Sequence, residues 1–521
     1  MESGVLFDQA LDAHKKGYLN AALRIYQQLV KLDPEHAGGW MNLGLVQQSL
    51  GASDQAFSAL KRATELAPDH GAVHYNLGNA LRNRGKMREA IFAYRKALLV
   101  DPELVDAFNN LGEVLMQKND QLTAISQFRA GLHKDPEHLG VRINLGNALY
   151  QVGKTKEALK LLKEAQKIAP NLAIIYHNLG NILRTSGQLK EAEKVLEKAI
   201  ELAPEDASTR VLMGFCKLSR GQFGAGWDAY AWRWKSNAHE AARNFPAPFW
   251  KGEPLTDKRL LIWGEQAVGD ELMFSAMYGD FAGVAAEVYI ETEFRLQPLL
   301  QRTFPDYNVI SRRDPPDNEL LKKIFDYQIS AGDLGRYLRR SFSDFSASRP
   351  VLKANQNRTN VLRDRYLSSA KGRRLVGISW HSKSEQAGIP RSIPLEALRT
   401  ILRNPDALFV NLQYGVTTKD LKKIADFGVD IINDPEINPL KNLDEAAAQI
   451  ASLDLVITVA NTTAHLSGAL DIPTWVILTK FPDWRWGTKG GITPWYPSVR
   501  LYRQKKQNNW RDPIKEIEAI L

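Results

Sequence analysis

One repeated segment decides the fold of the first half of this chain. It is HYNLGNALRNRGKMREAIFAYRKALLVDP, residues 74–102. Gly78 closes a polar-apolar run, Gly85 stands seven residues later, Ala90 opens a second apolar run, and Pro102 ends it. Two amphipathic runs separated by a glycine and stopped by a proline predict a pair of antiparallel helices.

The landmarks of this segment recur with a period of 34 residues. The four series are Pro34, Pro68, Pro102, Pro136, Pro170 and Pro204; Gly44, Gly78, Gly112, Gly146, Gly180 and Gly214; Gly17, Gly51, Gly85, Gly153, Gly187 and Gly221, with Asn119 in the one gap; and Ala22, Ala56, Ala90, Ala124, Ala158 and Ala192. This is the tetratricopeptide pattern. We predict seven helical hairpins, from about residue 3 to about residue 235, stacked into a right-handed solenoid with a concave inner face.

Asparagine recurs at one position of these repeats, two residues before the first glycine. The members are Asn42, Asn76, Asn110, Asn144 and Asn178, and a second set three residues later is Asn79, Asn147 and Asn181. The two sets share one helix face. An amide both donates and accepts, so a ladder of them could bind the backbone of an extended peptide without contacting its side chains. The alternative is that these amides cap or bridge neighbouring helices.

Beyond residue 240 short apolar segments alternate with helical ones. The predicted strands are 259–265, 286–292 and 325–331, followed by 374–380, 407–413, 429–434, 453–459 and 473–479. This alternation predicts parallel sheets with helices on both faces, arranged as two doubly wound lobes that face a cleft. We therefore divide the chain into a solenoid at 1–240, a first lobe at 241–352 and a second lobe at 353–521. The closing helix is expected to cross back over the first lobe.

An aromatic run ends the repeats. Trp227, Tyr230, Trp232 and Trp234 have mixed spacing. We interpret them as an apolar cap that docks the last repeat onto the next domain.

Ligands of parallel sheets bind at the carboxyl ends of the strands. After the first strand comes GEQAVGDELMF, residues 264–274. Gly269 permits close approach of a ligand, and Asp270 could take a proton from an acceptor hydroxyl. The alternative is that Asp270 only caps a helix.

The second lobe opens with GISWHSKSEQAGIPRSIPLEAL, residues 377–398. Trp380 ends a strand, and His381, Ser382, Lys383 and Arg391 lie in the loop directly after it. A loop with two cations suits a diphosphate. The alternative is solvated surface charge. Gln413, in NLQYG at the end of another strand, could contact a base or ribose.

Small polar residues also stand where a strand gives way to a helix in ITVANTTAHLSGAL, residues 457–470. Asn461, Thr462, Thr463 and His465 would bring an amide, hydroxyls and free N–H groups to the start of that helix, where the dipole favours an anion. We predict a phosphate site here without a P-loop. The alternative for His465 is a buried histidine of the core.

Composition excludes several classes of protein. The net charge of +9 is spread over the whole chain, which does not suit a nucleic-acid surface. The single cysteine, Cys216, has no metal-ligand spacing with any histidine, and the chain has no D-x-D, no H-E-x-x-H and no P-loop motif. We therefore expect no metal and no cofactor. The first residues do not form a signal peptide, no segment approaches ~20 apolar residues, and we predict a cytoplasmic location.

The order of six segments resembles bacterial tetratricopeptide-linked glycosyltransferases. They are FWKGEPL (249–255), LLIWGEQAVGD (260–270), GISWHS (377–382), NLQYG (411–415), LDLVITVANTTAHLSGAL (453–470) and FPDWRWG (481–487). The catalytic half is similar to the heptosyltransferase-type family, which implies a two-lobed GT-B fold. Within this group the chain looks most like enzymes proposed to glycosylate flagellin and other proteins. The asparagine ladder resembles that of the O-linked N-acetylglucosamine transferases, where it holds an acceptor polypeptide.

The resemblance implies roles for particular residues. Asp270 matches the catalytic base, Arg391 a cation that binds donor phosphate, and Thr462, Thr463 and His465 the donor-phosphate loop. Ala460 departs from the pattern, because heptosyltransferases have Asp there. Asn461 also stands in place of the following Thr. These departures argue against an ADP-heptose donor and imply either a changed donor or a weakened enzyme.

Together these features predict a metal-independent glycosyltransferase that moves a sugar from a nucleotide donor to Ser or Thr of a protein held by the solenoid, with Asp270 and His465 as its catalytic residues. The resemblance implies that the reaction inverts the anomeric configuration. One alternative is a scaffold with a degenerate catalytic half. The other is a lipopolysaccharide core sugar transferase, which would leave the solenoid without a role.

Overall fold

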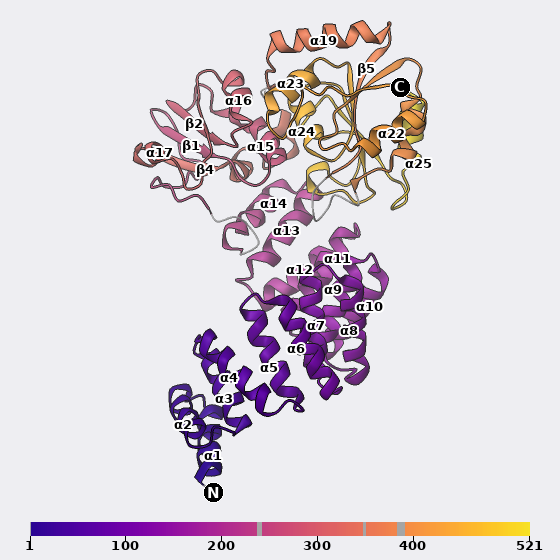
Figure 1. The fold of residues 1–521 in the computed structure, drawn as a ribbon. Coiled ribbons are helices and arrows are strands. Elements are labelled where there is room, and N and C mark those ends of the chain that lie inside the picture. The colour runs from indigo at the N-terminus through magenta and orange to yellow at the C-terminus, as the bar shows by residue number, and fades with distance from the viewer. Residues whose placement is uncertain (1, 237–241, 347–350, 383–390) are drawn as a thin grey trace. The chain divides into compact units, whose positions relative to one another are not determined.

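The computed structural model describes residues 2–236, 242–346, 351–382 and 391–521. They form two compact units, Met1–Ile182 and Leu183–Leu521 (Figure 1). The first unit is helical, and the second contains the last repeat helices together with two parallel sheets. The division by packing thus falls before the predicted boundary at residue 240, because the final helices pack with the α/β half.

The predicted seven helical hairpins are confirmed. Their helices are α1 Glu2–Lys15, α2 Leu19–Leu32, α3 Ala37–Ser49, α4 Ser53–Leu66, α5 Gly71–Asn83, α6 Met87–Val100, α7 Val105–Gln117, α8 Gln121–Lys134, α9 Leu139–Gln151, α10 Thr155–Ile168, α11 Ala173–Thr185, α12 Leu189–Leu202, α13 Ala207–Ser219 and α14 Phe223–Tyr230. From α1 to α10 each helix packs on its neighbours in chain order.

Two landmarks of the repeat have direct physical causes. A Cβ at Gly112 would lie 2.4 Å from a ring carbon of Phe128, so only glycine allows α7 and α8 to approach this closely. Asn119 has a φ of 59°, in the left-handed region that the turn glycines of the other repeats also occupy. Asparagine tolerates that region, which explains why it can replace glycine in this repeat.

The carbonyl of a repeat proline is bound by the side chain six residues later. The pairs are Trp40 Nε1 with Pro34 O at 2.9 Å, His74 Nε2 with Pro68 O at 2.8 Å, Arg142 with Pro136 O, Tyr176 OH with Pro170 O at 2.7 Å, and Arg210 Nε with Pro204 O at 2.8 Å. Since a carbonyl only accepts, each of these side chains donates. Five different residue pairs thus tie successive hairpins together in the same way.

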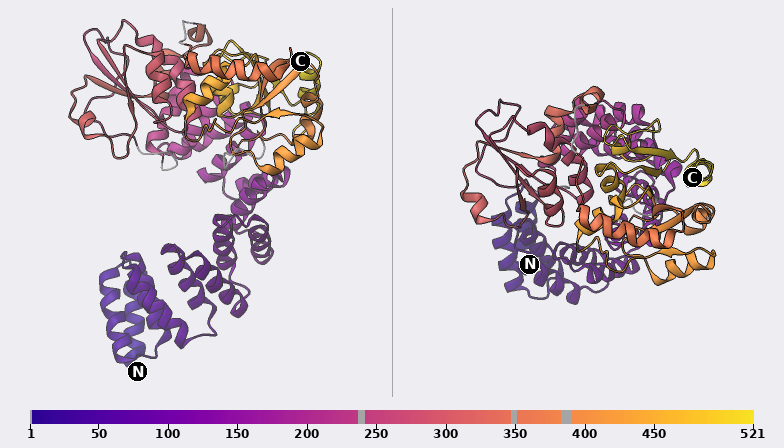
Figure 2. Two further views of the ribbon diagram at one scale, coloured as in Figure 1. Left: turned by 45° about the horizontal axis from the view of Figure 1, so that its top comes forward. Right: turned by 90° about the horizontal axis from the view of Figure 1, so that it is seen from above.

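Both sheets of the second unit are parallel. The strands are β1 Arg259–Trp263, β2 Glu287–Thr292, β3 Asn308–Ser311, β4 Tyr327–Ser330, β5 Arg374–Ser379, β6 Ala407–Asn411, β7 Ile431–Ile432, β8 Leu455–Val459, β9 Thr474–Leu478 and β10 Val499–Arg503. Their orders are β3-β2-β1-β4 and β10-β9-β8-β5-β6-β7. Figure 2 shows the two strand groups side by side, the first in rose and the second in orange and yellow. The predicted α/β half is confirmed.

The remaining helices of the second unit connect these strands. They are α15 Val268–Phe274, α16 Gln297–Thr303, α17 Asn318–Lys322, α18 Gly335–Leu338, α19 Gln356–Ala370, α21 Arg399–Leu402, α22 Thr418–Asp426, α23 Leu443–Ala451, α24 Thr462–Ala469 and α25 Arg511–Glu518, with 3₁₀ turns η1 Ala231–Lys235, η2 Ser275–Phe281, η3 Ala331–Leu334, η4 Phe342–Ser346, η5 Leu395–Leu398 and η6 Trp484–Trp486. The closing helix α25 packs on β10, α21 and η5. Its predicted crossing to the first lobe is therefore wrong, because Ile514 and Ile517 belong to the core of the second sheet.

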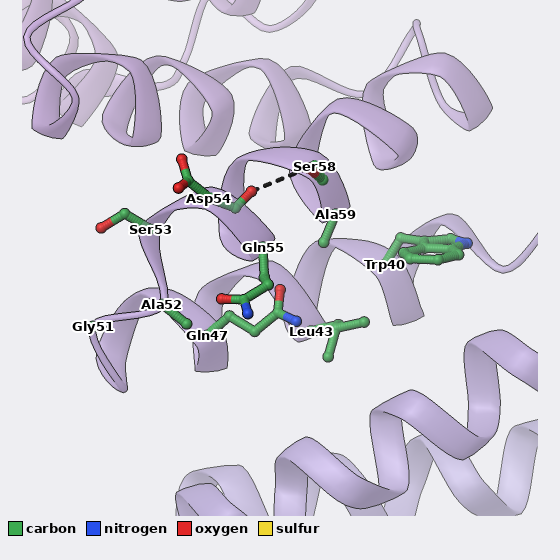
Figure 3. A pocket seen from close by; sticks show the side chains of 10 residues that line it. All are labelled: Trp40, Leu43, Gln47, Gly51, Ala52, Ser53, Asp54, Gln55, Ser58 and Ala59. Atoms are coloured by element: carbon green, nitrogen blue, oxygen red, sulfur yellow. Dashed lines mark hydrogen bonds between the residues drawn. The ribbon is translucent and has the colours of Figure 1, made fainter.

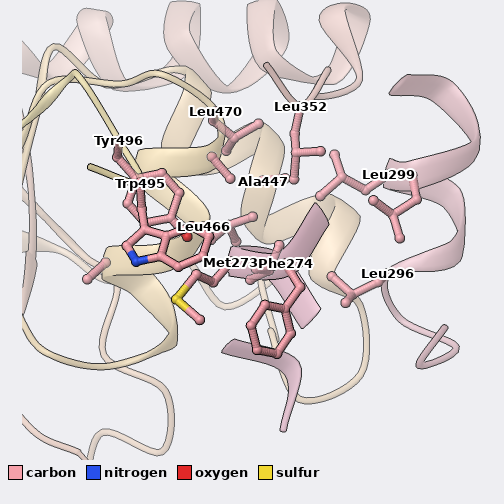
Figure 4. Close-up of a cluster of buried hydrophobic side chains, with 14 of the residues drawn as sticks. Met273, Phe274, Leu296, Leu299, Leu352, Ala447, Leu466, Leu470, Trp495 and Tyr496 are labelled. Carbon is pink, nitrogen blue, oxygen red and sulfur yellow. The ribbon is translucent and has the colours of Figure 1, made fainter. Parts of the chain in front are cut away.

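One face of each sheet contributes to a shared hydrophobic core. Met273 and Phe274 of α15 lie in the same cluster as Leu466 of α24, Trp495 and Tyr496 (Figure 4). Helix α15 packs directly on α24. The predicted cleft between the lobes is thus replaced at this place by direct packing of the two helices.

The predicted aromatic cap is confirmed: Trp234 packs on Trp263 of β1, with ring centroids 5.1 Å apart, and Trp232 packs against the same cluster as Trp227 and Tyr230. Trp227 and Tyr230 are buried, and the Trp227 ring lies 5.4 Å from Trp484 and 6.5 Å from Phe274. Its Nε1 also donates to Arg339 O at 2.9 Å. The last repeat helix is therefore part of the core on which the α/β half is built.

Candidate functional site

The strand order places a switch point between β5 and β8, where the direction of sheet growth reverses. Ligands of such sheets bind outside the carboxyl ends of the strands at that point. Asn461 follows β8 there and is the N-cap of α24, with Oδ1 accepting from Ala464 N at 3.3 Å. Its Nδ2 donates to Ser379 Oγ at 2.9 Å and to His381 O at 3.3 Å, so the side chain joins the ends of β5 and β8.

His465 lies inside the packed region. It is 6% exposed, its Nδ1 hydrogen-bonds with Tyr496 OH at 3.1 Å, and its ring lies 4.9 Å from Trp486. Burial, with Arg485 and Arg391 nearby, lowers the pKa of His465 to about 3. The imidazole is therefore neutral at pH 7. These are the features of the alternative, a buried and partnered histidine.

Gly269 brings the two candidate loops together. A Cβ at Gly269 would lie 3.5 Å from Cδ2 of His465 and 3.7 Å from Oγ1 of Thr462. Thr463, the next residue of α24, is buried. The backbone at the start of α15 therefore lies against the first turn of α24.

Asp270 is held by an arginine from the other lobe. Oδ1 of Asp270 accepts from Arg485 Nε at 2.7 Å and also from Arg485 Nη2. Burial outweighs this cation and raises the pKa of Asp270 above its usual value. The N-cap of α15 is Ala267, so the helix-cap alternative for Asp270 is wrong.

A second acid and a second cation continue this contact. Asp483 Oδ1 lies 3.6 Å from Arg485 Nη1, and Asp483 Oδ2 lies 2.8 Å from Arg391 Nη2. Burial favours the neutral acid, but Arg391 and Arg485 outweigh it and lower the pKa of Asp483. Asp270, Arg485, Asp483 and Arg391 thus form a row of alternating charge, which we call the charge row. Their side chains are 12%, 19%, 15% and 27% exposed.

Sequence reasoning identified only the two ends of the charge row. Asp483 and Arg485 stand in the quoted segment FPDWRWG, but no motif gives those residues a chemical role. The only feature of the sequence that could have identified Asp483 and Arg485 is that they are charged residues among aromatic ones, shortly after a strand.

The side chains of Gln413 and Trp380 make their contacts within the protein. Oε1 of Gln413 accepts from Trp380 N at 3.1 Å and from His381 N at 2.8 Å, so Gln413 holds the loop after β5. Trp380 is 5% exposed and packs in the core of the second sheet. The predicted donor contact of the Trp380 ring is therefore wrong in this arrangement. His381 Nδ1 hydrogen-bonds with Ser392 Oγ at 2.8 Å. Lys383 lies outside the described residues.

The asparagine ladder bridges neighbouring repeats. Asn110 Nδ2 donates to Asn79 Oδ1 at 2.8 Å, and Asn144 Nδ2 donates to Glu113 Oε1 at 2.8 Å. Asn42 Nδ2 donates back to Gly38 O of its own helix at 3.0 Å. Asn110 and Asn144 therefore make the bridging contacts of the alternative, whereas Asn42 binds only its own helix. Nδ2 of Asn178 is buried without a partner among the described residues. Asn76, Asn147 and Asn181 lie half-buried on the same faces of their helices.

Two hollows lie away from the charge row. One of about 650 Å³ lies between α3 and α4, where Gln47 and Gln55 extend into it beside Trp40 (Figure 3). The other, of about 450 Å³, is lined by Arg302, Leu352 and Leu470. Among the described residues no group of three or more His, Cys, Asp or Glu could hold a metal ion, and no helix is long and apolar enough to cross a membrane.

Comparison with known proteins identifies the repeats. Residues 7–71, 78–119 and 137–205 match tetratricopeptide-repeat families. Protein FlbA of Caulobacter vibrioides is 31% identical over 320 residues, which make up 58% of this chain and 53% of FlbA. The chain thus spans about half the length of this relative.

Solved structures are similar to part of this chain. YrrB, a tetratricopeptide protein with an unusual peptide-binding site, is 22% identical over 35% of this chain and 95% of its own, with a TM-score of 0.31. PilW, a type IV pilus biogenesis factor, is 19% identical over 41% and 99%, with a TM-score of 0.39. From the family matches, the first half of the chain contains tetratricopeptide repeats, and the second half is an α/β structure with two parallel sheets.

Proposed function

We propose that this protein is a glycosyltransferase that moves a sugar from a nucleotide-sugar donor to Ser or Thr of a protein acceptor. One observation carries the proposal. Asp270, which follows β1 of the first sheet, and Arg391, which follows β5 of the second, belong to one charge row beside the first turn of α24. A carboxylate and cations at the carboxyl ends of two parallel sheets suit proton removal on one side and diphosphate binding on the other.

In this mechanism Asp270 takes the proton of the acceptor hydroxyl as its oxygen bonds to the anomeric carbon. The bond from that carbon to the donor phosphate breaks on the opposite face, so the configuration inverts. The electron pair stays on the leaving diphosphate, whose charge Arg391 and the N–H groups at the start of α24 stabilise. Metal and cofactor are not required by this scheme.

The repeats would hold the acceptor polypeptide. Tetratricopeptide repeats bind proteins or peptides, and their amides lie half-buried along successive helices. Amide groups that bridge repeats keep oxygen lone pairs for a peptide backbone. The resemblance to enzymes proposed to act on flagellin makes flagellin encoded by the same genome the first acceptor to test.

The test has a binding step and a transfer step. Thermal unfolding is first measured with a panel of nucleoside mono- and diphosphates, for the natural protein and for Arg391→Gln. We expect one nucleotide to raise Tm, and a smaller rise in the variant. The sugar donor with that base is then incubated with flagellin, and the mass of flagellin is measured. A mass increase that Asp270→Asn abolishes supports the proposal, while unchanged flagellin with every donor contradicts it.

A second candidate is a binding scaffold whose α/β half no longer catalyses. Specific observations favour it: Trp380 is buried, the Gln413 and Asn461 side chains bind the protein itself, and α15 packs directly on α24. A scaffold would retain its protein partner, ignore every nucleotide and tolerate Asp270→Asn.

A further inference from the structure

Arg485 has the position of a cation shared by two acids. It comes from the segment after β9 and crosses to α15, where both of its hydrogen bonds end on the same oxygen of Asp270. Its own backbone N–H donates to Asp483 Oδ1 at 3.0 Å. Trp484 supports the guanidinium, whose carbon lies 4.7 Å from the ring centroid. The side chain is thus fixed at its base, while its charged end binds the other lobe.

We propose that Arg485 is an exchangeable cation, which binds Asp270 in the free protein and passes to the diphosphate of the donor when that ligand binds. This inference rests on the proposed function, because it assigns the ligand of the same site. It adds a positioning residue that neither the sequence motifs nor the resemblance identifies.

The charges of the row favour such an exchange. Two carboxylates and two guanidinium groups sum to zero, so a diphosphate enters a neutral cluster rather than a positive one. An anion then competes with Asp270 and Asp483 for the same two cations. Carboxylate and phosphate both accept paired N–H bonds from a guanidinium, so Arg485 can change partner with little change in geometry.

Proton transfer would complete the exchange during reaction. When Asp270 takes the acceptor proton it becomes neutral, and it loses its attraction for Arg485. At the same moment the bond between the anomeric carbon and the phosphate oxygen breaks, and the leaving diphosphate gains one negative charge. Arg485 can follow that charge. The charged and titratable groups that act on Asp270 include Arg485, Asp483, Glu265 and Tyr230, and His465 lies against the adjacent Gly269.

Inorganic pyrophosphate is the probe, and its Kd for the full chain is measured by calorimetry at constant pH. Asp270→Asn removes the competing carboxylate and should tighten binding about fivefold or more. Arg485→Gln should weaken it about tenfold or more, and Arg485→Lys by less. In the Arg485→Gln background Asp270→Asn should change Kd less than about twofold, because the two residues act through one contact.

Arg302→Gln is the matched control. Arg302 of α16 donates two hydrogen bonds of 2.7 Å to Asp444 of α23. The substitution therefore removes an equivalent ion pair between the same lobes and leaves the charge row intact. It should leave Kd unchanged. An Asp270→Asn protein that binds pyrophosphate no tighter than the natural one overturns the exchange, although the phosphate site itself would stand. If the natural protein binds neither pyrophosphate nor any nucleoside diphosphate, the proposed function fails as well.

Discussion

Arg233 donates two hydrogen bonds to Glu265, from Nε at 2.9 Å and from Nη2 at 2.7 Å. The arginine lies in η1, directly after the last repeat helix, and the glutamate follows β1. Arg233 is fully buried and also donates to Asp333 Oδ1 at 2.8 Å, next to β4. One guanidinium thus joins the end of the repeats to the loop that leads to Asp270.

Removing this cation should leave two buried carboxylates without their partner. We expect Arg233→Met to lower the free energy of unfolding of the second unit by about 3–5 kcal/mol. Chemical unfolding followed by tryptophan fluorescence measures it, because Trp40 is the one tryptophan of the first unit. Adding Glu265→Gln and Asp333→Asn should restore most of the loss. A single variant as stable as the natural protein would contradict the prediction.

His465 should make the protein sensitive to acid. Its pKa is lowered from 6.5 to about 3 in the folded state, so the unfolded chain binds a proton first as the pH falls below 6.5. The contribution of His465 to stability is therefore full above pH 6.5 and is lost towards pH 3. Relative to His465→Gln, the natural protein should lose roughly 2–3 kcal/mol between pH 7 and pH 4.5. Unfolding curves for both proteins at each pH test this, and a constant difference would contradict it.

Glu271 should make the protein less stable as the pH rises, which is the opposite of the effect of His465. Burial raises its pKa to about 7, its Oε1 has no hydrogen-bond partner among the described residues, and Arg312 Nη1 lies 3.6 Å from that oxygen. The folded state therefore holds a proton that the unfolded chain releases near pH 4.5. This contribution is full below pH 4.5 and is lost as the pH rises through 7.

Glu271→Gln keeps the acceptor for Thr292 Oγ1 and Glu293 N without the charge. Its stability relative to the natural protein should rise by roughly 3 kcal/mol between pH 4.5 and pH 8.5. The measurement is the same set of unfolding curves. If the variant is no more stable than the natural protein at pH 8.5, the folded protein holds the charged form of Glu271 without a large loss of stability.

Gly112 should not tolerate even one methyl group. Because a Cβ there would lie 2.4 Å from Phe128, Gly112→Ala should destabilise the first unit by about 1–3 kcal/mol. Gly4, inside α1 with nothing within 4 Å of its Cβ position, is the control. Gly4→Ala should be neutral or stabilising by up to about 1 kcal/mol. Helical circular dichroism during thermal unfolding separates the two, and equal effects would contradict the close packing.

The periodic features were predictable because each rests on local chemistry. Residue spacing and the backbone preferences of a few neighbouring residues predict the helix pairs, most of the strands and the turn at Asn119. The edge strands β3 and β10 were missed, because an edge strand buries only part of its side chains: in β3 Val309 is buried and Asn308 is exposed. A half-exposed segment of four or five residues carries little hydrophobic pattern.

The site was predictable in place but not in its contacts. Strand-end position predicted correctly that Asp270, Asn461 and His465 gather near α24. Partners could not be predicted, since Asp270 and Arg485 are 215 residues apart and meet only through packing of the two lobes. For the same reason Gln413 was expected to face a ligand, whereas its side chain binds the loop after β5.

The proline carbonyls of the repeats have a consequence for how the solenoid comes apart. Indole, imidazole, guanidinium and phenol groups all supply the same donor, so a seam between hairpins accepts side chains of quite different shape. Phe108 holds this position after Pro102, and a phenyl ring has nothing to donate. The contact between α6 and α7 therefore lacks the hydrogen bond that the equivalent contacts have. We expect the solenoid to separate first between α6 and α7 when it is heated or pulled.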